Sequence, residues 1–282
     1  MKRRDFLQTA GLLAAGVTDT LATCRASEAA DSQVRGRRAS ADTAIKEVLV
    51  TSAQSELARA TAAELKGDYQ VRLTAPVHVE TPCEFVKSAL DHGERTNLAV
   101  RGVDAIVHVA EPLPDSGHVD GIDYRTRCTY NLLQAAVKEG VQSIVYLSSL
   151  RMMGGSDKSF QVDEDWRPLP TPASGGLSDY LGEFTCREFA REGRLNVIVL
   201  RLGNVVSAGA SREEASNSAW IDPRDVARAV SCALTRLPAS RAAIGGRWSI
   251  FHVTSHSPSS RFPIRKARRI LGYRPDFGGK ES

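Results

Sequence analysis

The hydrophobic residues of this chain fall into two kinds of segment, short runs of Val, Ile and Leu and longer stretches with helical spacing. Two of the short runs, Ala105–Val109 and Ser143–Leu147, are typical of strands buried on both faces of a parallel sheet. Between them, small and apolar residues recur every four positions, and Gly140 follows where a left-handed cap is favoured. The recurring residues are Cys128, Leu132 and Ala136. This pattern predicts two parallel strands joined by a helix.

Similar segments flank this unit on both sides. A helix is predicted to begin at Pro223, after Asp222, and a basic amphipathic helix is predicted over Arg261–Leu271. The sequence therefore predicts an α/β fold, a doubly wound, Rossmann-like parallel sheet over residues 46–205, followed by a small C-terminal lobe over residues 206–282 that contributes substrate-side elements. The further predicted strands are Glu47–Val50, Tyr69–Leu73, Asn196–Leu202 and Arg247–Val253.

The pattern also indicates where a ligand would bind. In such sheets, ligands lie beyond the carboxyl ends of the strands, because right-handed crossovers bring the following loops to that edge. Ala110-Glu111-Pro112 and Ser148-Ser149 follow or end the two central strands. Ala110 and Ser149 are therefore candidate contacts of a bound cofactor or substrate.

Composition excludes several other classes of protein. The 282 residues are 42% hydrophobic and 25% charged, which suits one large α/β domain and no integral membrane span. The formal charge of +4 comes largely from residues 1–40, and the remainder holds 30 basic and 29 acidic residues. This balance gives no indication of nucleic-acid binding. The five cysteines include no C-x-x-C pair and no His at zinc-ligand spacing, so we expect no structural metal.

The N-terminus resembles a twin-arginine export signal. Arg3-Arg4 precede Phe6-Leu7 and an apolar run, Ala10–Val17, which is too short to span a bilayer. We therefore predict an export signal over residues 1–24 and a periplasmic or cell-envelope location. The alternative is an ordinary basic start followed by a stray helix, in a cytoplasmic protein. Residues 25–44 are rich in Ala, Ser, Arg and Asp, as expected of a disordered tether.

Six segments in order resemble extended short-chain dehydrogenases/reductases, specifically the NAD-dependent epimerase/dehydratase family, which acts on sugars and sugar nucleotides. The resemblance covers residues 46–275 and implies NAD or NADP as cofactor, a sugar-like small-molecule substrate and a homodimer as a possible assembly. The segments read V-D-A-I-V-H-V-A, Y-N-L-L-Q-A-A, V-Y-L-S-S, L-R-L-G-N-V, I-D-P-R-D-V-A-R-A-V and R-F-P-I-R-K-A-R-R-I-L-G-Y-R-P.

The expected phosphate-binding loop departs from the family pattern T-G-x-x-G-x-x-G. Thr51 is kept, but Ser52, Ser55 and Ala58 replace the three glycines. Ala58 can fill the third role, which is close packing of helix on strand. Ser52 would enter a turn that favours positive φ at a cost of roughly 1 kcal/mol, and Ser55 would place a side chain where the pyrophosphate lies. We therefore expect weakened binding of NAD or NADP. Thr74, at the end of the second strand, does not distinguish the two.

The catalytic Tyr-x-x-x-Lys of the family is half retained. Tyr180 matches the tyrosine and Ser149 the catalytic Ser/Thr, but Phe184 stands at the lysine position. That lysine favours the phenolate and holds the nicotinamide ribose, and phenylalanine can do neither. Arg187 is the nearby cation that could substitute for it.

Two functions therefore remain open. The first is an NAD(P)-dependent epimerase, dehydratase or dehydrogenase acting on a sugar or sugar nucleotide, with Tyr180 as acid/base and Ser149 as hydrogen-bond donor to the substrate. The second is a non-catalytic relative that binds a ligand or serves as a scaffold. Because the glycines and the lysine are replaced at two separate positions needed for hydride transfer, the sequence favours impaired catalysis.

Overall fold

The computed structural model describes the chain from residue 44 to residue 277, with gaps. The predicted export signal and residues 25–43 of the tether lie outside the described part. The described ranges are 44–114, 117–172, 175–206, 219–237, 246–255 and 260–277.

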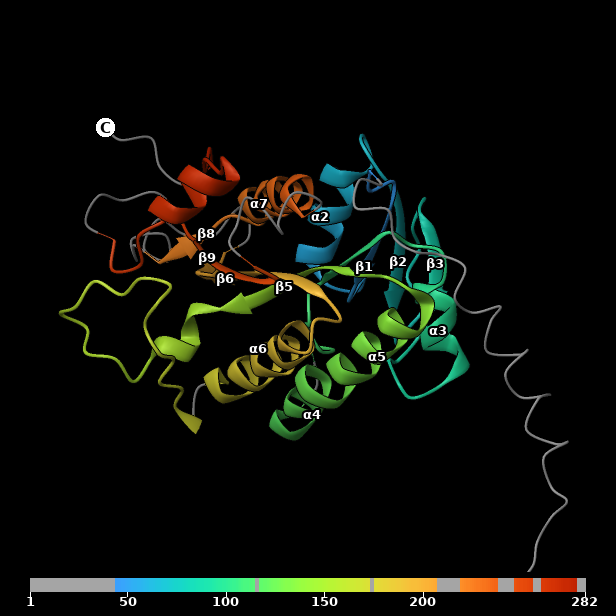
Figure 1. Ribbon diagram of the computed structural model, residues 1–282, viewed down its shortest axis with the longest axis horizontal. Coiled ribbons are helices and arrows are strands. Elements are labelled where there is room, and N and C mark those ends of the chain that lie inside the picture. The colour runs from blue at the N-terminus through green and yellow to red at the C-terminus, as the bar shows by residue number, and fades with distance from the viewer. Residues whose placement is uncertain are drawn as a thin grey trace, which may run out of the picture. The chain divides into compact units, whose positions relative to one another are not determined.

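A seven-stranded parallel sheet forms the centre of residues 41–282 (Figure 1). Its strand order is β3-β2-β1-β4-β5-β6-β9. Successive strands are added towards one edge from β1 to β3 and towards the other edge from β4 onwards, so the winding reverses between β1 and β4. This order confirms the predicted doubly wound α/β fold, and all of the predicted strands are present within two residues of their expected bounds. The strands are β1 (Glu47–Thr51), β2 (Gln70–Ala75), β3 (Glu84–Lys87), β4 (Ala105–His108), β5 (Ser143–Ser149), β6 (Asn196–Leu202) and β9 (Trp248–Val253).

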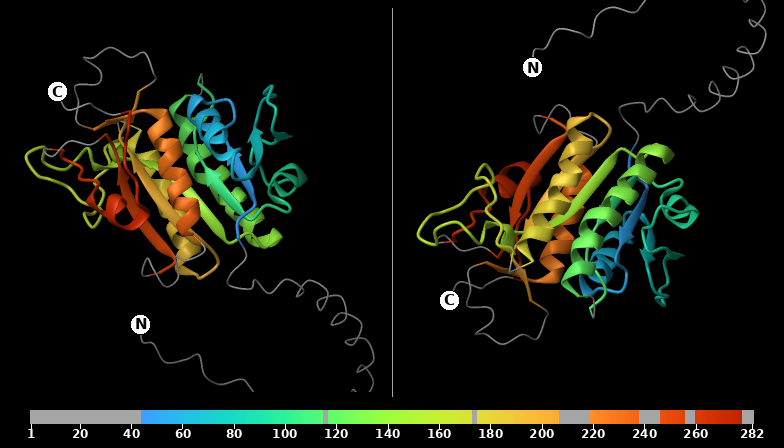
Figure 2. Two further views of the ribbon diagram at one scale, coloured as in Figure 1. Left: turned by 90° about the horizontal axis from the view of Figure 1, so that it is seen from above. Right: turned by 90° about the horizontal axis from the view of Figure 1, so that it is seen from below.

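Helices cover both faces of the sheet (Figure 2). On one face α2 (Glu56–Leu65) and α7 (Pro223–Arg236) pack their apolar sides over the strands, and on the other face lie α3, α5 and α6. Each face therefore has its own hydrophobic core, and strands between them are buried on both sides as predicted. The second group comprises α3 (Glu94–Val100), α4 (His118–Asp123), the π-helical η1 (Tyr124–Cys128), α5 (Thr129–Glu139) and α6 (Gly176–Arg191).

Helix boundaries follow the signals in the sequence. Gly140 caps α5 at φ 84°, a left-handed conformation that glycine adopts without steric cost. Pro223 opens α7, and the Asp222 side chain accepts the Arg224 N–H at 2.8 Å. The basic helix predicted from Arg261 begins only at residue 265 and continues into the π-helical η5 (Ala267–Leu271). None of the described helices has the length and hydropathy required to cross a membrane.

The segment after residue 205 does not form a lobe separate from the sheet. Its strand β9 is hydrogen-bonded to β6 as the seventh strand, and its helix α7 packs beside α2 in the same core. A small parallel ladder joins β7 (Asn204–Val205) to β8 (Trp220–Ile221) at the carboxyl end of β6. The predicted boundary therefore cuts through a continuous core, because the last strand completes the sheet.

Candidate functional site

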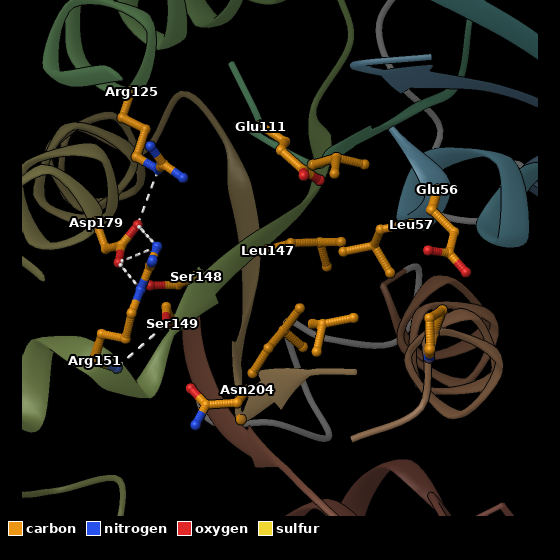
Figure 3. A pocket seen from close by; sticks show the side chains of 15 residues that line it. Glu56, Leu57, Glu111, Arg125, Leu147, Ser148, Ser149, Arg151, Asp179 and Asn204 are labelled. Carbon is orange, nitrogen blue, oxygen red and sulfur yellow. Dashed lines mark hydrogen bonds and ion pairs between the residues drawn. The ribbon is translucent and has the colours of Figure 1, made fainter. Parts of the chain in front are cut away.

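A cavity of about 440 Å³ lies at the carboxyl ends of β4, β5 and β6 (Figure 3). Leu57 at the start of α2 and Leu147 on β5 contribute apolar wall, while Ser148 and Ser149 contribute hydroxyl groups. Arg125, on η1, also lines it. The cavity is therefore at the edge of the sheet that the strand pattern indicated, next to the point where the strand order reverses.

The turn between β1 and α2 keeps a residue in the left-handed conformation, but that residue has a side chain, which makes hydrogen bonds within the protein. Ser52 is fully buried and adopts φ 59°, so a side chain occupies a conformation that favours glycine. Its Oγ lies 3.1 Å from the Tyr124 hydroxyl and accepts the Glu111 N–H at 3.1 Å. Burial raises the pKa of Tyr124 to about 12, so this phenol stays neutral. The Ser52 hydroxyl thus links the turn to the segment after β4.

The N-terminus of α2 is capped by a side chain of the protein itself. Ser55 is the N-cap, and its Oγ accepts the Ala58 N–H at 3.1 Å, so one free donor of the helix terminus is already used. The Gln54 amide donates to the Glu111 carbonyl at 3.0 Å. Ala58 is fully buried against the sheet, as the small residue at this position was expected to be.

Thr51 and Ala110 lie behind the cavity wall and do not line it. The Thr51 hydroxyl accepts the Val109 N–H at 3.1 Å and lies 2.8 Å from His108 Nδ1. His108 Nε2 is 2.9 Å from the Thr129 hydroxyl, and burial lowers the pKa of this imidazole to about 3. Ala110 is buried at φ 55°. These residues shape the turn and do not offer a side chain to a ligand.

The described residues do not fit a dinucleotide well. Glu56 in the first turn of α2 and Glu111 after β4 both line the cavity, so carboxylates lie where an anionic pyrophosphate would approach the helix terminus. The Ser52 and Ser55 side chains occupy the turn that the glycines would leave open. At the end of β2, the Thr74 hydroxyl donates to the Val86 carbonyl at 2.7 Å and is therefore already used.

Of the two predicted catalytic residues, only Ser149 lines the cavity, because the rotation of α6 about its axis turns Tyr180 away from the lining. Asp179 lines the cavity and Glu183 is buried, whereas Tyr180, about 100° further around the helix, does not line it. Tyr180 packs against an apolar cluster, and its ring lies 6.4 Å from that of Phe184. The buried members of this cluster are Leu150, Met152, Met153, Val162 and Phe262. Phe184 is 42% exposed. The structure therefore places Ser149 at the cavity and Tyr180 and Phe184 outside its lining.

The Arg187 side chain does not replace the absent lysine at the cavity. Its guanidinium lies 5.7 Å from the Phe184 ring and 3.8 Å from Glu188, and it is about half exposed. A lysine at position 184 would start from the same exposed side of α6. The Arg187 guanidinium, which could have substituted for the lysine, thus lies along the exposed surface of the helix.

Close packing at Gly182 accounts for this rotation of α6. A Cβ at this position would overlap the Tyr146 hydroxyl and lie 2.7 Å from the Arg125 carbonyl oxygen. Only a residue without a side chain allows α6 to approach η1 and β5 this closely, and Cys186 and Ala190 continue the same buried face. Because Asp179 and Glu183 flank Gly182 on that face, they point inward.

Two arginines from separate segments converge on Asp179 at the cavity wall (Figure 3). Arg125 Nε lies 2.9 Å and Arg151 Nη2 lies 3.0 Å from the carboxylate, whose side chain is only 4% exposed. The Arg151 backbone N–H donates to Ser149 Oγ at 3.2 Å, directly after the end of β5. Asp179 directly precedes Tyr180, the residue that the sequence motif indicated. Only the rotation of α6 in the folded structure shows that Asp179 is the one facing the cavity.

A buried ion pair supports the floor of the cavity. Ser148 Oγ donates to Glu183 Oε2 at 2.9 Å. Arg201 donates to both oxygens of the same carboxylate, from Nε at 3.0 Å and from Nη2 at 2.6 Å, and its side chain is 2% exposed. Since the Ser148 O–H donates its hydrogen bond to Glu183, the lone pairs of the Ser148 oxygen are left to accept a hydrogen bond from a ligand. The motif gave no signal for Glu183 and Arg201, which meet only through packing of α6 on β6.

Comparisons with known proteins agree with this architecture. Residues 43–221 match the NAD dependent epimerase/dehydratase family. A mutated uronate dehydrogenase superposes with a TM-score of 0.68 at 23% identity over 82% of each chain. A glucuronic acid dehydrogenase from Chromohalobacter salexigens gives 0.67 at 22% identity, over 82% of this chain and 85% of that chain.

A UDP-N-acetylglucosamine 4-epimerase from Bacillus cereus also gives a TM-score of 0.67, at 19% identity over 82% of this chain and 94% of that chain. At these identities, the likeness shows the fold. No curated protein matches the sequence.

Proposed function

The chain belongs to the NAD-dependent epimerase/dehydratase family, and we propose that it binds a sugar-like ligand in the cavity while its hydride-transfer chemistry is impaired. Membership confirms the resemblance of the sequence motifs. The uronate and glucuronic acid dehydrogenases among similar structures favour a sugar or sugar acid as the ligand. Impaired chemistry is supported by the sequence, in which Phe184 stands where the family pattern has a lysine.

One observation carries this proposal. The cavity keeps the hydroxyl groups of Ser148 and Ser149, which can hydrogen-bond a polyhydroxylated ligand, but Tyr180 does not line it. An acid/base must come within hydrogen-bond reach of the proton that it transfers. Tyr180 instead packs against the apolar cluster that contains Met152 and Met153. Binding is therefore better supported than turnover.

Weak cofactor binding is the first expected consequence. NAD and NADP should bind the native protein with dissociation constants nearer millimolar than micromolar, a difference of about 4 kcal/mol. Replacing Ser52 and Ser55 together by glycine should tighten binding by about tenfold, because the turn is emptied and its left-handed position relaxed. Isothermal titration calorimetry measures both constants. The alanine double variant is the matched control, since it removes the hydroxyls and keeps each Cβ. Micromolar binding by the native protein would contradict the steric argument.

We also propose that the protein is exported through its twin-arginine-like N-terminus. Replacing Arg3 and Arg4 by lysine should retain the full chain in the cytoplasm, because paired arginines before Phe6-Leu7 are the feature that resembles the signal. Cell fractionation followed by immunoblotting measures the location. Replacing Arg37 and Arg38 by lysine is the control for a general effect of exchanging paired arginines for lysines, which leaves the charge unchanged in both variants. If both variants fractionate like the native protein, the export interpretation is wrong.

The homodimer that the sequence resemblance suggested stays a prediction.

A further inference from the structure

We propose that Arg125 and Arg151 form a carboxylate-binding site in the cavity, and that Asp179 occupies this site as an internal competitor of the ligand. The inference rests on the proposed function, since it assumes that the cavity binds a sugar-like molecule. It adds the chemical class of that molecule, a polyhydroxylated carboxylic acid, and names a residue of the chain that limits its affinity.

The geometry around Asp179 is that of a bound carboxylate. Arg151 contacts both of its oxygens, through Nε at 3.1 Å from Oδ2 and through Nη2 at 3.0 Å from Oδ2 and 3.3 Å from Oδ1, as a guanidinium does with a planar anion. Arg125 reaches the same group from η1 through Nε at 2.9 Å. A planar group with two oxygens therefore already fits between the two arginines, and the protein supplies it from α6.

The two arginines keep donors that Asp179 does not use. Arg125 engages it through Nε alone, and Arg151 through Nε and Nη2, so within the described part of the chain both Nη groups of Arg125 and Nη1 of Arg151 make no hydrogen bond. Both side chains line the cavity, and that of Arg151 is 47% exposed. A ligand can therefore reach unused N–H groups from the cavity side.

Charge favours a second anion beside the first. Two guanidinium groups share a single carboxylate, so this part of the wall has an excess of one positive charge. The opposite part of the cavity holds Glu56 and Glu111, which repel anions, and the repulsion grows with the charge of the ligand. A singly charged carboxylate is therefore favoured over a doubly charged phosphate.

Neighbouring hydroxyl groups indicate what the rest of the ligand offers. The Ser148 hydroxyl donates its hydrogen bond to Glu183, so towards a ligand its oxygen serves as an acceptor, which suits a ligand hydroxyl. Ser149 Oγ accepts the Arg151 N–H, so its proton can be donated to a ligand oxygen. A volume of about 440 Å³ holds one sugar ring with water. Together these groups fit a sugar acid better than a simple fatty or aromatic acid.

Competition by Asp179 predicts an unusual response to substitution. Asp179→Asn keeps the shape of the side chain and removes its charge, so both arginines become available to the ligand. D-glucuronate should then bind at least tenfold more tightly than to the native protein. Arg151→Gln should weaken glucuronate binding at least tenfold. D-glucose, the matched neutral sugar, should bind weakly and be affected by neither substitution. Calorimetry on the full chain measures these constants.

The outcomes separate this inference from the proposed function. If glucose and glucuronate bind equally well and Asp179→Asn changes neither, the carboxylate site is wrong and the sugar-binding cavity stands. If no variant binds either sugar, both are wrong. Should Asp179→Asn fold poorly, its melting temperature gives the same answer. Glucuronate should raise it by several degrees more than sodium chloride at equal ionic strength, and an equal response to both salts would overturn the proposal.

Discussion

Replacing Arg201 by methionine is expected to lower the free energy of unfolding by about 3–5 kcal/mol, because it leaves the buried Glu183 carboxylate without its cation. Arg201 is 2% exposed and donates to both oxygens of Glu183. Glu183→Gln should be destabilising for the same reason. Both effects should appear in urea denaturation followed by circular dichroism.

The double variant and a surface pair provide the controls. Replacing Arg201 and Glu183 together by methionine should cost clearly less than the sum of the single changes, because no uncompensated charge remains buried. Arg127 and Asp123 make a similar two-bond pair on the surface, where both side chains are about half exposed. Arg127→Met should therefore cost less than about 1 kcal/mol. Equal losses for Arg127→Met and Arg201→Met would show that burial of the pair has no energetic consequence.

Acid is expected to destabilise the protein at pH values well above the range in which its carboxylates protonate. His108 and His252 are fully buried, and burial lowers the pKa of each imidazole to about 3. Their unfolded-state pKa is about 6.5, so the unfolded chain binds protons that the folded chain does not. Stability is full above pH 6.5 and falls as the pH drops towards 3. The slope is about 1.4 kcal/mol per pH unit for each histidine.

The cations around the two histidines act in the same direction as burial, whereas a neighbouring carboxyl group acts against it. Arg125 further lowers the pKa of His108, and Arg201 and Lys266 lower that of His252. Glu164 accepts the His252 backbone N–H at 3.0 Å, and burial raises the pKa of this carboxyl. A raised carboxyl pKa stabilises the folded state as the pH falls, so Glu164 offsets part of the loss. We expect a net loss of about 3 kcal/mol between pH 6.5 and pH 5.

His252→Phe separates this effect from general acid denaturation. Within the described part of the chain neither ring nitrogen of His252 has a hydrogen-bond partner, and the ring stacks edge-on against Phe262 at 5.8 Å. The variant should keep its stability at pH 8 and lose about half of the dependence on pH between 6.5 and 5. Melting curves across this range measure it, with His252→Leu as a smaller replacement. An unchanged pH dependence in both variants would mean that His252 does not titrate as described.

The sequence alone determined the architecture. Runs such as Asn196–Leu202, in which every residue proved to be buried, specify strands of a parallel sheet, and Gly140 and Pro223 mark helix boundaries through local conformational preferences. Local rules suffice here because period, caps and chirality leave few ways to arrange alternating strands and helices. Even Ser52 could be expected to take a left-handed conformation, since the turn itself requires it.

Only the tertiary structure decided which side chains share the cavity. A motif gives the spacing between Tyr180 and Phe184 but not the rotation of their helix, which depends on how closely Gly182 approaches the Tyr146 hydroxyl from another element. The joining of β9 to the sheet likewise rests on contacts distant in sequence. Arg125 and Arg151 are brought to Asp179 by three separate segments, and no local pattern records that they meet. The rotation of α6 and the meeting of these charged side chains both result from tertiary packing. The residues that line this cavity could therefore be identified only from the folded structure.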